Sequence, residues 1–244
     1  MPGDRVGQTQ LPVGFNLEEL KKCLADYGLL ALGGLTLETS QCALGREHEN
    51  GKLGLLIGNA GPDMWVHFAR SCEFRDGHSD PMNRWTRRIL EALATDLNSQ
   101  VVFPFDKPYW PFQRLARHVQ STKPSPLGIV IHPEYGLWHA LRGMFLFEFS
   151  EELFNEIKLI NGSLGNEVHP CDNCADKPCL SACPVGAFDG ATLNVKPCFK
   201  HLDGDKEPDC LQSGCLARNA CPFGQQYIYP NEQIRFHMKS YRGF

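Results

Sequence analysis

Apolar residues recur every three or four positions in three parts of the chain, a spacing that is typical of amphipathic helices. The first helix follows Asn16, which suits the N-cap position, and ends at Gly28. The second begins at Asp80–Pro81, because aspartate caps helices and proline is tolerated at the first helical position. A third helix is expected near residues 111–120. Each helix carries its apolar side chains on one face, so each is predicted to cover a core.

Short apolar runs bounded by turn residues predict buried strands. Four such runs occur, over residues 53–57, 101–103, 127–131 and 144–149. Because these strands alternate with helices, we expect an α+β fold with a three-layer domain over roughly residues 11–160.

The pattern changes at residues 161–166, where asparagine, glycine and serine interrupt the periodic apolar positions. Beyond this segment cysteine, proline, glycine and aspartate dominate. Such a sequence cannot bury a large apolar core without help, and a bound metal centre would supply the missing stability. We therefore expect two domains, 1–160 and 161–244, the second being small and built around metal.

The overall composition of the 244 residues is that of an ordinary globular protein. Twenty-eight acidic against 24 basic residues give a formal net charge of −4, which disfavours nucleic-acid binding through bulk phosphate neutralisation. No apolar run approaches the roughly 20 residues that cross a bilayer. The N-terminus lacks the apolar segment of a signal peptide. A cytoplasmic protein that binds no membrane is expected.

Eight of the 11 cysteines lie between residues 171 and 221. The first four have the spacing C-x2-C-x4-C-x3-C-P, and the second four are more widely spaced but also end in Cys-Pro. In a reducing compartment such a density favours metal ligation over a disulfide framework. Two quartets match the thiolates of two [4Fe–4S] clusters, with structural zinc as the alternative. The expected ligands are Cys171, Cys174, Cys179, Cys183, Cys198, Cys210, Cys215 and Cys221.

This cysteine-rich segment resembles bacterial ferredoxin modules that hold two clusters. In those modules the cysteine before proline ligates the other cluster. The resemblance implies a ferredoxin-like domain in which one cluster is held by Cys171, Cys174, Cys179 and Cys221. The other would be held by Cys198, Cys210, Cys215 and Cys183. Two such clusters pass single electrons from a soluble donor to an acceptor, which we expect in the larger domain.

Two stretches of the larger domain, 103–118 and 126–143, combine aromatic residues, proline and glycine with histidine and arginine. Such residues can wall a flat pocket and offer polar contacts to a large ligand. The second stretch contains Ile-His-Pro, Gly-x-Trp and Arg-Gly elements. With the order of features before it, over about residues 50–147, it resembles the cobalamin-processing CblC family.

The CblC resemblance implies a nitroreductase-like fold and a corrinoid ligand. It implies that Gly128 lines the corrinoid site, that His118 lies near the corrin and that Arg142 contacts a thiol cosubstrate such as glutathione. From their own positions, His132 and Trp138 are further candidates for cofactor contact.

A cobalamin domain joined to a two-cluster module is the layout of epoxyqueuosine reductase, a tRNA-modifying enzyme, and reductive dehalogenases pair the same cofactors. In the former an aspartate donates a proton near the corrin, and Asp106 is the nearest match here. Asp106 is therefore the candidate catalytic residue, although an aspartate before Lys-Pro also starts turns.

The other candidates have structural alternatives as well. His132 precedes a proline and can cap local backbone. His118 can be a packing histidine, Trp138 a core residue, and Arg142 can pair with a carboxylate such as Glu134.

The combined features predict a corrinoid-dependent iron–sulfur reductase. It would use two [4Fe–4S] clusters to reduce a bound corrinoid, either to remove the upper ligand of cobalamin or to reduce an organic substrate. The alternative is a ferredoxin-type electron-transfer partner protein without a corrinoid. A deep pocket beside a cluster favours the enzyme, and a flat surface around His118, His132 and Arg142 favours the carrier. A flavin reductase is a third option, but no glycine-rich phosphate-binding loop follows a strand.

Overall fold

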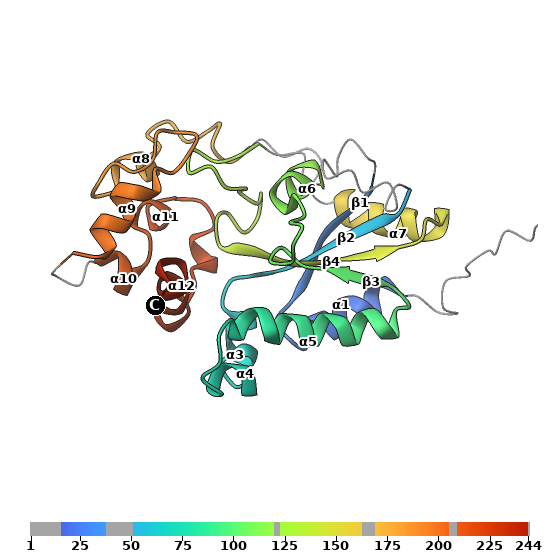
Figure 1. Cartoon of the computed structure of the whole chain (residues 1–244). Coiled ribbons are helices and arrows are strands. Elements are labelled where there is room, and N and C mark those ends of the chain that lie inside the picture. Colours follow the sequence, from blue (N-terminus) through green and yellow to red (C-terminus); the bar gives the residue numbers. More distant parts are fainter. Residues whose placement is uncertain (1–15, 38–50, 120–122, 163–168, 205–208, 244) are drawn as a thin grey trace, which may run out of the picture.

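A four-stranded antiparallel sheet covered by helices forms the larger part of the protein, and short helices gather beside one end of it (Figure 1). The computed structural model describes residues 16–37, 51–119, 123–162, 169–204 and 209–243. The sheet has the strand order β1-β2-β4-β3. Its strands are β1 (Leu30–Thr36), β2 (Leu53–Ala60), β3 (Gln100–Val102) and β4 (His139–Phe147).

Side chains of the two central strands alternate between the faces of the sheet, and each face has its own core. Leu55 and Phe145 belong to the core on one face, and Leu56 and Met144 to the core on the other. The first face is covered by α1 (Leu17–Ala25), α3 (Asp63–Phe68) and α5 (Pro81–Asp96). The second is covered by α6 (Phe112–Val119). Helix α7 (Glu151–Gly162) packs against β1, and its Leu153 and Ile157 belong to the core of the first face. The result is the expected α+β arrangement of three layers.

Two of the predicted helix starts are found. The Asn16 side chain accepts hydrogen bonds from the backbone N–H groups of Glu18 and Glu19, at 2.9 and 3.3 Å. Helix α5 begins at Pro81, but Asp80 makes no side-chain cap and instead has a left-handed backbone with φ of 52°. The strands expected at 53–57, 101–103 and 144–149 correspond to β2, β3 and β4, which differ from the expected bounds by a few residues.

The prediction of a strand over residues 127–131 is wrong. This segment forms a loop with isolated bridges only, from Pro124 to Val130 and from His132 to Gly136. Its apolar character has another cause, because Leu127 and Ile131 pack on the cysteine-rich body rather than in the sheet. Strand β1, which contains two adjacent glycines, was not predicted.

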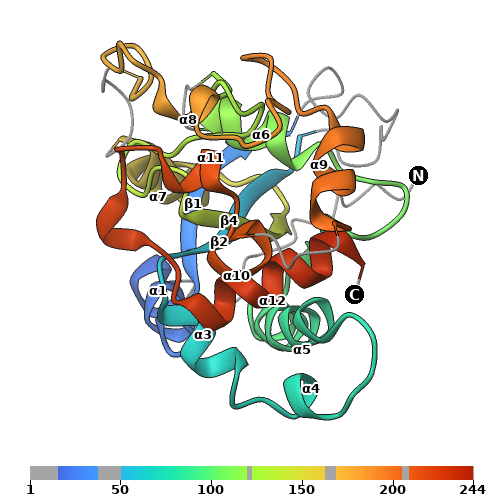
Figure 2. The same ribbon diagram turned by 90° about the vertical axis from the view of Figure 1, so that its left-hand side faces the viewer.

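The cysteine-rich body consists of short helices joined by turns, and it lies at the end of the sheet where β2 finishes and β4 begins (Figure 2). One of them, α12, also returns to the larger part, where Phe236 packs on Trp65 and Phe68 with ring centroids 5.5 and 5.3 Å apart. The helices are α8 (Pro178–Ser181), α9 (Val195–Leu202), α10 (Asp209–Ser213), α11 (Leu216–Asn219), the 3-10 helix η2 (Gln225–Tyr227) and α12 (Asn231–Arg242). No helix in the described part of the chain is long and apolar enough to cross a membrane.

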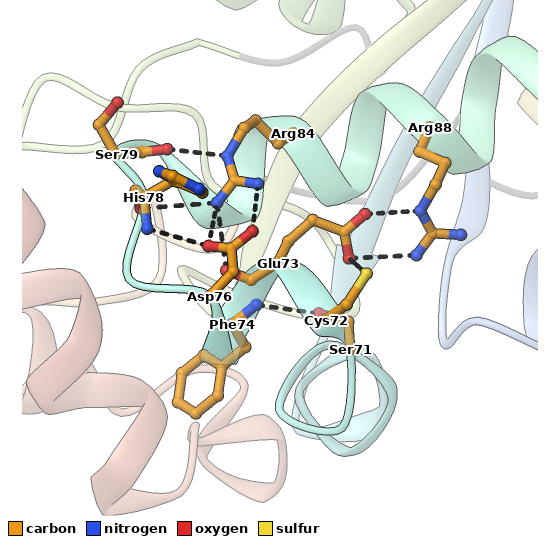
Figure 3. Close-up of polar contacts among 9 residues, drawn as sticks. All are labelled: Ser71, Cys72, Glu73, Phe74, Asp76, His78, Ser79, Arg84 and Arg88. Atoms are coloured by element: carbon orange, nitrogen blue, oxygen red, sulfur yellow. Dashed lines mark hydrogen bonds and ion pairs between the residues drawn. The ribbon is translucent and has the colours of Figure 1, made fainter.

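A polar cluster fixes the short helix α4 (Cys72–Arg75) to α5 (Figure 3). The buried carboxylate of Glu73 accepts hydrogen bonds from Arg88 at 2.5 and 3.2 Å. These bonds lower the pKa of Glu73 to about 2. Arg84 forms a two-bond pair with Asp76, at 2.7 Å for each bond, on the exposed side of the same loop.

We expect Glu73→Gln to lower the free energy of unfolding by about 1–2 kcal/mol, because a charge-assisted bond is replaced by a neutral one while Arg88 stays half exposed. The pKa of Glu73 is lower in the folded state than its ordinary value of 4.5, so this contribution is lost only as the pH falls from about 4.5 toward 2. The difference from wild type should therefore be constant between pH 8 and 5.5. Urea unfolding followed by tryptophan fluorescence measures it.

Asp76→Asn is the matched control, since its ion pair is exposed and screened by solvent. A larger loss of stability in Asp76→Asn than in Glu73→Gln would contradict this ranking.

Candidate functional site

The eight clustered cysteines line two separate cavities of about 270 Å³ each in the cysteine-rich body. The first cysteine cavity is lined by Cys171, Cys174, Cys179 and Cys221. The second cysteine cavity is lined by Cys183, Cys198, Cys210 and Cys215. The cysteines that precede proline, Cys183 and Cys221, each line the cavity of the other quartet. This grouping is the one that the ferredoxin resemblance implies.

Electrostatic interactions between the thiols divide them in the same way. Burial raises the pKa of Cys171 to about 11, and the charges of Cys221, Cys179 and Cys174 raise it further. Burial likewise raises the pKa of Cys198, with added contributions from Cys215, Cys183 and Cys210. Such thiols stay protonated near neutral pH, so they are poor nucleophiles. A bound cation would reverse this balance by stabilising the thiolates.

Nearby polar groups hold the cysteine loops in place. The Lys177 ammonium donates to the carbonyls of Cys171 and Cys174 at 3.2 and 2.9 Å. The first cysteine loop is therefore closed around this lysine side chain. In the second set, the backbone N–H of Ala187 donates to Cys183 Sγ at 3.3 Å. Hydrogen bonds to ligating sulfurs tune the potentials of iron–sulfur clusters.

Each cysteine cavity offers four thiols, a donor set known both for four-iron clusters and for structural zinc. Among the described residues, no three His, Cys, Asp or Glu side chains are placed to hold one ion together. The thiolates of a four-iron cluster stand further apart than zinc ligands, because each binds a different iron. All ten cysteines within the described ranges are free thiols. Four thiols in one cavity are the number of protein ligands that a four-iron cluster needs.

A third and larger cavity of about 800 Å³ lies between the sheet and the cysteine-rich body and is open to solvent. Residues of β4, of α6 with its preceding loop, and of α11 and α12 line it. The stretch 103–118, expected to wall a pocket, contributes much of this lining. The residues are Pro104, Trp110, Pro111, Phe112, Gln113, Arg114, Arg117, Ile129, Val130, Leu137, His139, Ala140, Leu141, Arg142, Arg218, Tyr229 and His237.

The large cavity shares walls with both cysteine cavities. Ile129, Arg218 and His237 line the large cavity and the second cysteine cavity. Leu137 lines the large cavity and the first cysteine cavity. A molecule in the large cavity would therefore lie beside residues that also line a cysteine cavity.

The described lining of the large cavity is positively charged, since it includes four arginines and no acidic residue. Its histidines carry no charge at neutral pH. Burial lowers the pKa of His139 and of His237 to about 3, and in His237 the charges of Arg142 and Arg218 add to the effect.

Of the residues expected to bind a corrinoid, Arg142 lies in the lining of the large cavity. Its Nε donates to Asn59 Oδ1 at 2.7 Å, and burial lowers its pKa. It therefore pairs with a neutral amide of β2 rather than with the carboxylate of Glu134, which accepts a hydrogen bond from the Tyr227 hydroxyl at 2.8 Å.

His132 and Trp138 are buried beside the cavity and are not in its lining. His132 Nδ1 accepts from the backbone N–H groups of Glu134 and Tyr135 at 3.0 and 3.2 Å, so it caps its own loop. The Trp138 ring lies under the Arg218 guanidinium at 4.4 Å.

Gly128, His118 and Asp106 lie outside the lining of the large cavity. Gly128 has φ of 78°, and a Cβ there would meet the Ala191 carbonyl at 2.7 Å, so glycine permits close packing of the loop on the cysteine-rich body. His118 is exposed on α6. Asp106 forms an ion pair with Arg87 of α5.

Sequence analysis missed Arg218, Tyr229 and His237. Arg218 donates to the Leu137 carbonyl through Nε at 3.1 Å and Nη2 at 2.5 Å, so it joins the segment that follows Cys215 to the loop of the larger part. Arg218 could have been found from the sequence, because it lies three residues after Cys215, a predicted ligand. Tyr229 and His237 lie beyond the last cysteine, in no sequence pattern that would have indicated a site.

Comparisons with known proteins were made at the level of family, sequence and structure. No protein-family model matches the chain, and no curated protein matches it. Among solved structures, a selenomethionine-labelled epoxyqueuosine reductase is similar to this chain at 16% identity and a TM-score of 0.47. The likeness covers 90% of this chain and 69% of that one.

The grouping of the cysteines predicts which pairs of substitutions spare a cluster. In the double variant Cys183→Ser/Cys215→Ser both changes affect the second set, so about four irons should remain. In Cys174→Ser/Cys183→Ser each set loses a ligand, so both clusters should be lost. Iron and acid-labile sulfide analysis of anaerobically purified protein measures both outcomes.

If the first four cysteines held one cluster and the last four the other, the two results would be reversed. The variant Cys174→Ser/Cys183→Ser would then keep about four irons. Cys72→Ser, outside the cysteine-rich body, is the control and should keep the wild-type iron content.

Proposed function

We propose that this protein is an iron–sulfur oxidoreductase in which two [4Fe–4S] clusters deliver single electrons to an acceptor bound in the large cavity. The observation that carries the proposal is that this cavity shares wall residues with both cysteine cavities. When bound, the clusters would supply the electrons, and Leu137, Ile129, Arg218 and His237 would form the walls shared by the clusters and the acceptor. The cysteine cavities are lined largely by apolar residues, which limits access of water to the clusters.

The proposed electron acceptor is a corrinoid, used either to remove the upper ligand of cobalamin or to reduce an organic substrate. The size of the cavity, its opening to solvent and the aromatic wall formed by Trp110 and Phe112 suit a large, flat ligand. Arg142 would contact it directly. His132, Trp138 and Gly128 would act indirectly, by fixing the loop over residues 128–138.

The proton donor of such a reaction is not assigned to Asp106 in this proposal. Asp106 is held by Arg87 and lies outside the cavity lining. A catalytic acid needs to come within hydrogen-bond reach of the reacting group.

The alternative of an electron carrier without a corrinoid has less support. A carrier presents its cluster to the partner at a surface and needs no pocket beside it. Arg142 instead lines a cavity of about 800 Å³.

The experiment is a cobalamin titration of anaerobically purified protein, recorded by visible spectroscopy before and during reduction. About eight irons per chain, a spectral change on mixing and a further change on reduction are expected. Full iron content with no spectral change on mixing would reject the corrinoid and favour the carrier. Absence of iron would reject the proposal as a whole.

A cavity-filling variant makes this test specific. Ala140 lines the large cavity, so Ala140→Phe should keep the iron content and weaken the cobalamin response at least about tenfold. Ala92→Phe, on the exposed face of α5, is the matched control and should respond as wild type.

A further inference from the structure

Arg218 stands in the wall between the large cavity and the second cysteine cavity. Among the described residues, Ile129, Arg218 and His237 line both cavities. Ile129 is apolar, and burial lowers the pKa of His237 to about 3, so this histidine is neutral at physiological pH. Arg218 therefore supplies the positive charge of the shared wall.

The guanidinium of Arg218 is held by neutral groups. Its Nε and Nη2 both donate to the Leu137 carbonyl. Its central carbon lies 4.4 Å from the centre of the Trp138 ring and 4.9 Å from that of the Tyr229 ring, and both of these side chains are buried. In the described part of the chain no carboxylate forms an ion pair with Arg218. The position of the guanidinium is thus fixed, and no negative group offsets its charge.

Arg218 also acts on a thiol of the second cysteine cavity. Burial raises the pKa of Cys215, whereas the backbone N–H groups of Arg218 and Ala217 and the charge of Arg218 act in the opposite direction. These groups stabilise negative charge on the sulfur. An iron–sulfur cluster gains negative charge when it is reduced, and hydrogen bonds and charge around its sulfurs set its potential. The same groups would therefore favour the reduced state of a cluster that Cys215 ligates.

The first cysteine cavity has a cation of its own. Lys177 lines that cavity and donates to the carbonyls of Cys171 and Cys174, but it is not in the lining of the large cavity. Each set of thiols is thus associated with one positive side chain, and Arg218 is the one that also borders the space for the acceptor.

We propose that Arg218 is a positioning residue that raises the reduction potential of the second cluster and so favours the electron on the side that adjoins the large cavity. It acts through the cluster, by its charge, and not on the acceptor. This inference rests on the proposed function, because it requires clusters, but it does not depend on the identity of the acceptor.

The test is an anaerobic redox titration of the full chain with its clusters, followed by electron paramagnetic resonance and without added cobalamin. Arg218→Met removes the charge, so it should lower one of the two potentials by about 59 mV, a change of about tenfold in a one-electron equilibrium. Arg218→Lys keeps the charge but not the planar pair of donors, so it should retain most of the wild-type potential. Arg235→Met, on the exposed side of α12, is the charge-matched control and should titrate as wild type.

Two variants that each lack one cluster show which potential responds. In Cys171→Ser/Cys174→Ser the remaining cluster is the second, and adding Arg218→Met should lower its potential. In Cys183→Ser/Cys215→Ser the remaining cluster is the first, and adding Arg218→Met should leave its potential unchanged. A shift of the first cluster alone would overturn the inference.

Unchanged potentials in Arg218→Met with full iron content would overturn the inference and leave the proposed function intact. Equal shifts in Arg218→Met and Arg218→Lys would also overturn it, because geometry rather than charge would then be responsible. Arg218→Gln keeps a donor for the Leu137 carbonyl and is the second neutral variant. Loss of iron from both neutral variants, with full iron content in Arg218→Lys, would make Arg218 a structural residue and overturn the inference. Absence of iron in the wild-type protein would instead reject the proposed function, and the inference with it.

Discussion

The arrangement of the protein depends on how eight thiols, three of them buried and five half-buried, are packed in a segment with few apolar residues. In its own core this segment contributes Cys179, Ala217 and Cys221, and it borrows Leu127, Ile131 and Leu137 from the loop of the larger part. A core of this kind yields little hydrophobic stabilisation, and the buried thiols resist ionisation. Binding a cationic cluster would remove both problems, because it fills each cavity and stabilises the thiolates. On this argument the cysteine-rich body folds with its cofactor and against the sheet.

The same borrowed loop creates the large cavity. Gly136 and Gly224 allow backbone to meet backbone where the loop crosses the Cys221 segment, since a Cβ on Gly136 would lie 2.4 Å from the Phe223 carbonyl. Arg218 adds a second connection through the Leu137 carbonyl. The two parts are joined tightly along this line and diverge beside it, over β4 and α6. The cavity is thus the space left between a junction fixed by these contacts and a sheet edge fixed by its own core.

The sequence could predict the features that depend on local chemistry. The Asn16 cap, the start of α5 at Pro81 and the buried strand β2 follow from short patterns, and the resemblance to ferredoxin modules implied the same two groups of cysteines that line the two cavities. Prediction from the sequence failed where contacts with distant segments determine the local structure. The run over 127–131 is apolar because of a partner some 50 to 90 residues away, so its pattern alone suggested a strand. His132 and Trp138 stood out by composition but are used for the loop, whereas Tyr229 and His237 enter the cavity through the return of α12.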